Sequence, residues 1–200
     1  MNPGWGNRDT QVKIVLEGRL LRSGGEILEA SSSVALVIAG AKKMIVDTAS
    51  REDSARLRDA LKAMSVEVAE VDVVVNTHLH MDHCGCNDLF ENAMFYAHRL
   101  ESPPVGTVQI SRDVALLPGV ELIQTPGHTA GSISVLVHAE KRYAVVGDAI
   151  PTKANYDQHI PPSINIDRRL ALRSMELLLG AADVVIPGHG SPFACVSKKN

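Results

Sequence analysis

The stretch that decides the fold is NTHLHMDHCG, residues 76–85. It places three histidines and an aspartate between His78 and His83, directly after the apolar run VDVVV of residues 71–75. A short apolar run rich in β-branched residues is typical of a buried strand. Packing alone gives no reason to place four ionisable groups where a strand ends, since a buried polar group costs free energy unless it has a partner. The pattern therefore indicates a ligand site, and imidazole combined with carboxylate indicates a metal.

Three other predicted strands also end in a turn that leads to a side chain able to bind a metal. VELIQT (120–125) leads through Pro126 and Gly127 to His128, RYAVVG (142–147) leads to Asp148, and DVVI (183–186) leads through Pro187 and Gly188 to His189. Strands that end at a common edge of a sheet would bring these residues together with the first stretch. We therefore expect five histidines and two aspartates at one site. Such a set suits two divalent metal ions, zinc first, with iron or manganese as alternatives.

The spacing within the first stretch separates its side chains into two positions. In an extended chain His78 and His80 point to the same side, so both can reach one ion. Asp82 and His83 follow where the chain turns toward a short helix predicted after residue 83, so they can face a second ion. A carboxylate from Asp148 could bridge the two. A helical course for residues 78–83 is the alternative, and the strand-like VDVVVNT before it argues against that course.

The remaining patterns predict an α/β or α+β fold with helix-covered sheets. Further strands are expected at residues 11–18, 33–40, 43–48, 93–98 and 132–138. One helix should begin at Asp53 or Ser54 and present Leu57, Leu61 and Met64 on one face. A second should begin at Asp167, with Met175, Leu178 and Leu179 on its apolar stripe, and end at Gly180.

Composition excludes several classes of protein. The chain has 200 residues, 45% of them hydrophobic, and a net charge of −3, so we expect one domain spanning residues 1–200. No basic face is evident, so nucleic acid is a possible partner that the charge does not indicate, and a small molecule is the expected substrate. No signal peptide or membrane-length apolar run is visible. Three cysteines make no disulfide framework. We expect a reduced, cytoplasmic protein that does not enter the membrane, with a homodimer as an open alternative.

The motifs resemble those of the metallo-β-lactamase superfamily. THLHMDH (77–83), TPGHTAGS (125–132), VVGDA (145–149) and IPGHG (186–190) carry the resemblance, which extends over nearly the whole chain. It implies a four-layer αβ/βα sandwich with the site at one edge, between the sheets. It also implies that His78, His80 and His128 hold a first metal, that Asp82, His83 and His189 hold a second, and that Asp148 lies between them. Asp47 matches an aspartate behind the ligands, although it stands in D-T-A-S where the superfamily usually has D-T-G.

The predicted chemistry is hydrolysis by a metal-activated water or hydroxide, most simply of a small ester or thioester. Asp82 and Asp148 are the candidate catalytic residues, and Asp82 could orient the nucleophile or accept its proton. One alternative is a metal-dependent ribonuclease or phosphodiesterase, because some small members of the superfamily are linked to RNA 3′-end processing. Another is a persulfide dioxygenase-like oxidoreductase with one iron held by His78, His128 and Asp148. A closed, purely structural metal site needs only four ligands, so a non-enzymatic module is disfavoured.

Weaker candidates lie outside the ligand set. His159, in the Pro-rich stretch NYDQHIPPSIN (155–165), could reach over the cleft, although a surface loop histidine is the plainer interpretation, and Tyr156 has no better support. His98 and His138 are interpreted as structural. Cys84 and Cys86 flank Gly85 beside the ligands. A depressed thiol pKa would make Cys84 redox-sensitive or an additional ligand, and the alternative is a small buried side chain.

Overall fold

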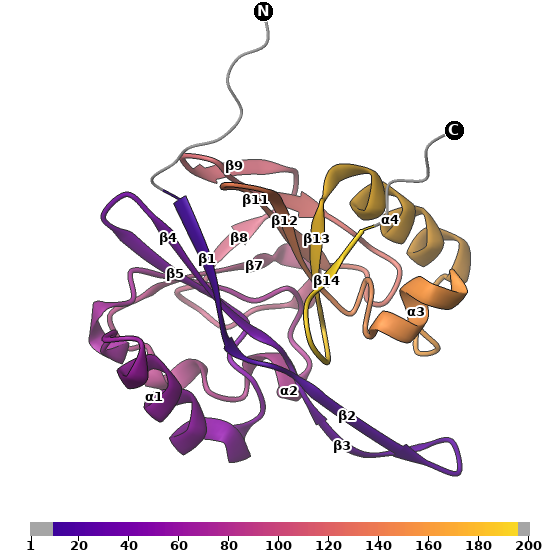
Figure 1. Ribbon diagram of the computed structural model, residues 1–200, viewed down its shortest axis with the longest axis horizontal. Coiled ribbons are helices and arrows are strands. Elements are labelled where there is room, and N and C mark those ends of the chain that lie inside the picture. Colours follow the sequence, from indigo (N-terminus) through magenta and orange to yellow (C-terminus); the bar gives the residue numbers. More distant parts are fainter. Residues whose placement is uncertain (1–9, 196–200) are drawn as a thin grey trace, which may run out of the picture.

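Two six-stranded sheets face each other, and helices cover their outer sides (Figure 1). This computed structural model describes residues 10–195. The first sheet has the strand order β1-β4-β5-β6-β7-β8 and the second has the order β14-β13-β12-β11-β10-β9. A separate two-stranded hairpin, β2–β3, extends away from the sandwich (Figure 1).

The first sheet combines antiparallel and parallel pairing. Strands β1, β4 and β5 are antiparallel neighbours, and β5 to β8 run parallel to one another. Parallel pairing directs the carboxyl ends of β5, β6 and β7 to the same edge. The strands are β1 (Thr10–Leu16), β4 (Val34–Ala39), β5 (Lys42–Val46), β6 (Val73–Val75), β7 (Met94–His98) and β8 (Val108–Ile110). The hairpin strands are β2 (Arg19–Ser23) and β3 (Glu26–Ser31).

The second sheet is antiparallel apart from the parallel pair β12–β13. Its strands are β9 (Val114–Leu117), β10 (Val120–Gln124), β11 (Ile133–His138), β12 (Arg142–Gly147), β13 (Val184–Pro187) and β14 (Phe193–Ala194). The α-helices are α1 (Ser54–Ala63), α2 (Met81–Cys84), α3 (Lys153–Gln158) and α4 (Arg168–Ala181). Short 3₁₀ helices lie at Arg51–Asp53, Val68–Glu70, Asn87–Leu89 and Arg99–Glu101.

Buried side chains form three layers of apolar contact, which define four layers of structure. Between the sheets, Val46 and Val75 of the first sheet belong to the same cluster as Val135 of the second, all at 0% exposure. The outer face of the first sheet packs against α1, and the outer face of the second packs against α4. Each leucine-sized side chain buried in this way stabilises the fold by about 1.5–3 kcal/mol. The arrangement confirms the predicted αβ/βα sandwich.

The apolar stripes of both predicted helices are confirmed, but some ends differ. Asp167 begins α4 and accepts hydrogen bonds from the backbone N–H groups of Arg169 and Leu170. Gly180 lies inside α4, which continues to Ala181, so it is not the stop. Asp53 precedes α1 without a capping bond, because its carboxylate instead accepts from Ser31 Oγ and from Arg19.

All nine predicted strands are present, and the elements that sequence analysis missed are short or exposed. The hairpin β2–β3 carries a register shift between Leu21 and Arg22, which breaks the period-2 pattern that would have revealed it. Helix α3 occupies residues that were expected to form a loop. Helix α2 begins at Met81 rather than after residue 83, so Asp82 and His83 lie on its first turn.

Within residues 10–195, no helix is both long and apolar enough to span a bilayer. That the chain forms one domain stays a prediction.

Candidate metal centre

Four segments, each following a strand, bring all seven predicted ligand residues to one edge of the sandwich. His78 and His80 follow β6, and Asp82 and His83 lie on α2 directly after them. The other three, His128, Asp148 and His189, follow β10, β12 and β13 respectively. The four strands end toward the same region, so residues from both sheets meet there.

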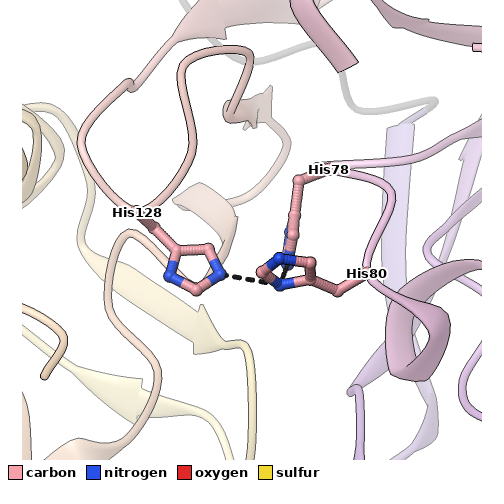
Figure 2. A group of neighbouring side chains, drawn as sticks. All are labelled: His78, His80 and His128. Atoms are coloured by element: carbon pink, nitrogen blue, oxygen red, sulfur yellow. Dashed lines mark hydrogen bonds between the residues drawn. The ribbon is translucent and has the colours of Figure 1, made fainter. Parts of the chain in front are cut away.

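The side chains of His78, His80 and His128 point toward one another (Figure 2). His80 Nδ1 lies 3.0 Å from both His78 Nε2 and His128 Nε2. The three residues can offer ligand atoms that all lie within 4.8 Å of one another. Three nitrogen atoms at such spacing can reach one metal ion.

A second group of ligand atoms comes from Asp82, His83 and His189. Asp82 Oδ2 lies 3.8 Å from His83 Nε2 and 3.6 Å from His189 Nε2. Asp148 lies between the two groups: its Oδ1 is 3.3 Å from His189 Nε2, and its Oδ2 is 3.5 Å from His128 Nε2. One carboxylate therefore faces both groups.

Two buried atoms at the junction of these groups lack hydrogen-bond partners. His83 Nε2 and Asp148 Oδ1 are both buried and unsatisfied, and they lie 3.5 Å apart. An unsatisfied buried polar group costs about 1–3 kcal/mol. A cation bound here would satisfy both atoms at once. The donor set thus fits a divalent metal.

Hydrogen bonds on the outer ring nitrogens orient three of the histidines. The Nδ1–H groups of His128 and His189 donate to the backbone carbonyls of Ile164 and Ser31, at 2.8 and 3.0 Å. His83 Nδ1 lies 2.8 Å from Asp47 Oδ2. Because a carbonyl can only accept, the proton of the neutral ring sits on Nδ1 and the lone pair of Nε2 faces the site.

Asp47 lies where it can hold both a ligand and the loop that carries the ligands. Its carboxylate accepts from the backbone N–H and the hydroxyl of Thr77, each at 2.7 Å, as well as facing His83. The backbone is left-handed at Asp47 (φ 57°) and at Ala49 (φ 62°). Ala49 thus adopts, at some conformational cost, the backbone that glycine would take in D-T-G.

Local electrostatics favour a neutral imidazole at His78 and His80 and an ionised carboxylate at Asp148, which are the states that metal ligands need. Burial and the neighbouring His83 hold the pKa of His78 well below its ordinary value, and burial and His128 lower the pKa of His80. Burial opposes ionisation of Asp148, but the close imidazoles of His189 and His83 outweigh it and place its pKa well below the usual range. Burial also acts against a charged His83, yet Asp47 and Asp148 raise its pKa well above normal. Surroundings that stabilise a cationic imidazole also stabilise a metal ion.

A cleft of about 100 Å³ opens onto these residues. His80, Asp82, His128, Asp148 and His189 line one side of it. The opposite walls come from the β2–β3 hairpin, through Leu20, Arg22, Ile27 and Ala30, and from the segment that holds Pro151, Pro162, Ser163 and Ile164. Arg22 Nη1 donates to Ser163 Oγ at 3.0 Å and so joins the two walls. The hairpin wall was not predicted from the sequence; its signal was the apolar Leu21, Ile27 and Leu28, which the structure leaves exposed.

The structure favours the plainer interpretation of Cys84 and of His159. Cys84 has no depressed pKa: burial and the carboxylates of Asp47 and Asp82 raise it to about 11. His159 does not line the cleft but ends α3, with its Nε2 3.3 Å from Glu176, beside a different cavity that Tyr156 also lines. The thiol sits too close to negative charge, and the imidazole is turned outward by the helix that sequence analysis missed.

The remaining sequence candidates have structural surroundings. Burial, followed by the charge of Asp88, raises the pKa of Cys86 to about 11. His98 accepts a hydrogen bond from the backbone N–H of Leu100 through Nδ1 and contacts Gln124 through Nε2. His138 Nε2 lies 3.6 Å from Glu121. These contacts agree with the structural interpretation of both histidines.

Comparison with known proteins gives a consistent picture. A profile of the Metallo-beta-lactamase superfamily matches residues 28–104. The chain is 40% identical to the "Probable metallo-hydrolase MJ0296" of Methanocaldococcus jannaschii, over 90% of this chain and 87% of the relative. It is 33% identical to metallo-beta-lactamase domain-containing protein 1 of Xenopus laevis, over 92% of this chain and 82% of the relative. An N-acyl homoserine lactonase from Bacillus sp is 31% identical over 67% of this chain and 62% of the relative.

Solved structures share the fold. The crystal structure of a quorum-quenching N-acyl homoserine lactone lactonase superposes with a TM-score of 0.74, at 23% identity, covering 92% of each chain. Likeness at this level of identity concerns the fold, while the match to the archaeal metallo-hydrolase extends over most of both sequences. The chain therefore belongs to the metallo-β-lactamase superfamily of metallohydrolases.

Proposed function

We propose that the protein hydrolyses a small ester, thioester or lactone with two divalent metal ions at this centre. The observation that carries the proposal is the pair of orphaned buried atoms, His83 Nε2 and Asp148 Oδ1, between two three-residue ligand groups. Neither atom has a reason to be buried unpaired unless a cation satisfies it. The nitrogen and oxygen donors favour zinc, with iron or manganese as alternatives.

The proposed ligand assignment follows the two groups. His78, His80 and His128 hold the first ion, Asp82, His83 and His189 hold the second, and Asp148 faces both. Ions bound in this way supply Lewis acidity and lower the pKa of water, so that hydrolysis can proceed at neutral pH.

The chain's own side chains supply positioning and proton transfer. Asp82 is partly exposed and lines the cleft, so it can orient an attacking water and accept its proton. Hydrogen bonds to Asp47 and to the carbonyls of Ser31 and Ile164 keep the imidazoles aimed at the centre. The histidines therefore need little rearrangement during the reaction.

The cleft favours a small carbonyl substrate with an apolar group. Leu20, Ile27 and Ile164 provide apolar walls beside the ligands, and Arg22 is the single lysine or arginine among the residues that line the cleft in the described part of the chain. A polynucleotide would need several cationic contacts along its phosphates. The lactonase relatives act, by their names, on N-acyl homoserine lactones, which combine a lactone carbonyl with an acyl group. The ribonuclease and iron oxygenase alternatives stay predictions, since no contact in the cleft favours them.

Metal content and turnover, measured on one sample, test the proposal. Protein reconstituted with zinc, manganese or iron should bind two equivalents of metal and hydrolyse esters, thioesters or lactones faster when the acyl group is apolar. His78→Ala should lose metal and about 100-fold or more of the activity, because the first group loses a third of its donors. His159→Ala, which changes a histidine outside the cleft, should retain both. Wild-type protein that binds none of these metals, or full activity in His78→Ala, would refute the proposal.

A further inference from the structure

Glu101 connects the two loops that carry the first ligand group, and sequence analysis did not identify it. This half-buried residue ends the 3₁₀ helix Arg99–Glu101, which follows β7. Its Oε2 accepts the backbone N–H of Leu79 at 3.0 Å. Its Oε1 accepts the hydroxyl of Thr129 at 2.6 Å and the backbone N–H of Gly131 at 3.0 Å.

The three donors lie directly beside the histidines. Leu79 stands between His78 and His80, and Thr129 follows His128. One loop leaves β6 of the first sheet and the other leaves β10 of the second, so a single carboxylate bridges the two sheets at the site. It adds to the backbone bond from the N–H of Ile133 to the carbonyl of Thr77, at 2.8 Å. Hydrogen bonds to an ionised acceptor are about twice as strong as neutral ones. No other described side chain is hydrogen-bonded to both of these loops through a charged group.

Gly131 allows the carboxylate to come this close. A Cβ atom at this position would lie 2.6 Å from Glu101 Oε1 and 2.9 Å from the backbone nitrogen of Glu101. Neither distance is compatible with van der Waals contact. Only a glycine at residue 131 leaves room for the Glu101 carboxylate in the loop after His128.

We propose that Glu101 is a positioning residue that holds His78, His80 and His128 in the geometry needed to bind a metal ion. It contacts no ligand side chain and acts through the backbone and the hydroxyl beside the ligands. This inference rests on the proposed metal centre. It adds a requirement that the ligand set does not contain, because loss of the carboxylate would remove three hydrogen bonds that fix the two ligand loops relative to each other.

Two substitutions interrupt the hydrogen bonds of Glu101 at different points. Glu101→Gln keeps the size of the side chain, but its amide nitrogen can only donate, so at least one of the N–H or O–H groups faces another donor. Thr129→Val removes one donor and leaves the two backbone donors in place. Glu121→Gln is the matched control, since Glu121 is also half-buried and lies on β10, away from the ligand loops.

The readouts separate positioning from stability. Co²⁺ is titrated into metal-free protein, the visible absorption spectrum reports the ligand geometry, and a competing chelator reports affinity. Melting temperatures of the metal-free and metal-loaded forms are compared for each variant. Glu101→Gln should weaken binding of one ion by about 10- to 100-fold and alter the spectrum. Thr129→Val should have a smaller effect, the double variant should be less than additive, and Glu121→Gln should behave as wild type.

Three results would overturn the proposal. The first is a Glu101→Gln protein with wild-type Co²⁺ affinity and spectrum. The second is an equal fall in the melting temperatures of the metal-free and metal-loaded forms, which would assign Glu101 a role in stability alone. The third is a wild-type protein that binds no metal, which would refute the metal centre as well. If Glu101→Gln does not fold, Thr129→Val decides between the outcomes by the same measurements.

Discussion

Replacement of Asp47 by asparagine should remove one metal ion while leaving the fold in place. Asn is nearly the same size as Asp and tolerates the left-handed backbone of this position (φ 57°). The amide oxygen can still accept the backbone N–H of Thr77, which now donates to Oδ1 at 2.7 Å. The amide nitrogen would replace Oδ2, the atom that faces Thr77 Oγ1 and His83 Nδ1. The hydroxyl can turn and become an acceptor, but the imidazole must change its tautomer.

That change of tautomer disables the ligand. To accept from the amide, His83 Nδ1 must lose its proton, which then sits on Nε2, the atom that faces Asp82 and Asp148. A protonated Nε2 has no lone pair for a metal. Loss of an outer hydrogen-bond partner typically reduces metal affinity by about 10- to 100-fold, or about 1.4–2.8 kcal/mol. The metal-free protein should lose only about 1–2 kcal/mol of unfolding free energy, because the other bonds can re-form.

Zinc titration against a chromophoric chelator, with urea denaturation of the metal-free protein, measures both quantities. Asp47→Asn should retain one tight ion and bind the second weakly. Asp72→Asn is the control: its carboxylate also accepts a backbone N–H, from Lys43 at 2.9 Å, but it directly precedes β6, whereas the ligands follow that strand. It should bind both ions as wild type does. Two ions bound to Asp47→Asn with wild-type affinity would refute the tautomer argument.

Three further predictions follow from single contacts. Gly188→Ala places a Cβ 2.2 Å from Asp148 Oδ1, so metal content and turnover should fall. Gly180→Ala, on the open surface of α4, should keep both. Normal metal content in Gly188→Ala would contradict this prediction. Hydrogen bonds from Arg142 lower the pKa of Asp183 from 3.8 to about 2, so its contribution is present at neutral pH and is lost as the pH falls toward 2. Asp183→Asn should therefore reduce the unfolding free energy at neutral pH by less than about 1 kcal/mol, since the pair is exposed. If the variant and the wild type still differed by the same unfolding free energy in acid, the ion pair would not be the cause. Cys84 and Cys86, with pKa values of about 11, should react slowly with iodoacetamide at neutral pH until urea unfolds the chain; rapid labelling of the folded protein, seen by mass spectrometry, would disprove it.

The sequence alone was sufficient to predict the elements whose pattern is local. Short apolar runs rich in β-branched residues revealed nine strands of the two sheets, and an aspartate followed by an apolar stripe revealed α4. The seven candidate ligands were also visible, because each stands directly after a strand end. Strand direction and side-chain alternation are properties of neighbouring residues, so they can be recognised without any knowledge of distant contacts.

Features that depend on two distant segments could not be predicted in this way. The hairpin β2–β3 gave no period-2 signal because its register shifts and most of it is exposed, yet it forms a wall of the cleft. The sequence left open whether His159 reaches over the cleft or lies on the surface, and α3 turns it toward Glu176. The role of Glu101 depends on a glycine 30 residues away that leaves room for its carboxylate.

The sequence by itself therefore determined which side chains are available for metal chemistry and which strands present them. Tertiary structure alone decided which nitrogen of each histidine faces the site, what lines the cleft, and which carboxylate joins the ligand loops. The bond between His189 and the carbonyl of Ser31, 158 residues apart in the chain, shows why. Such contacts arise from the packing of two sheets against each other, and no local pattern of residues encodes their partners.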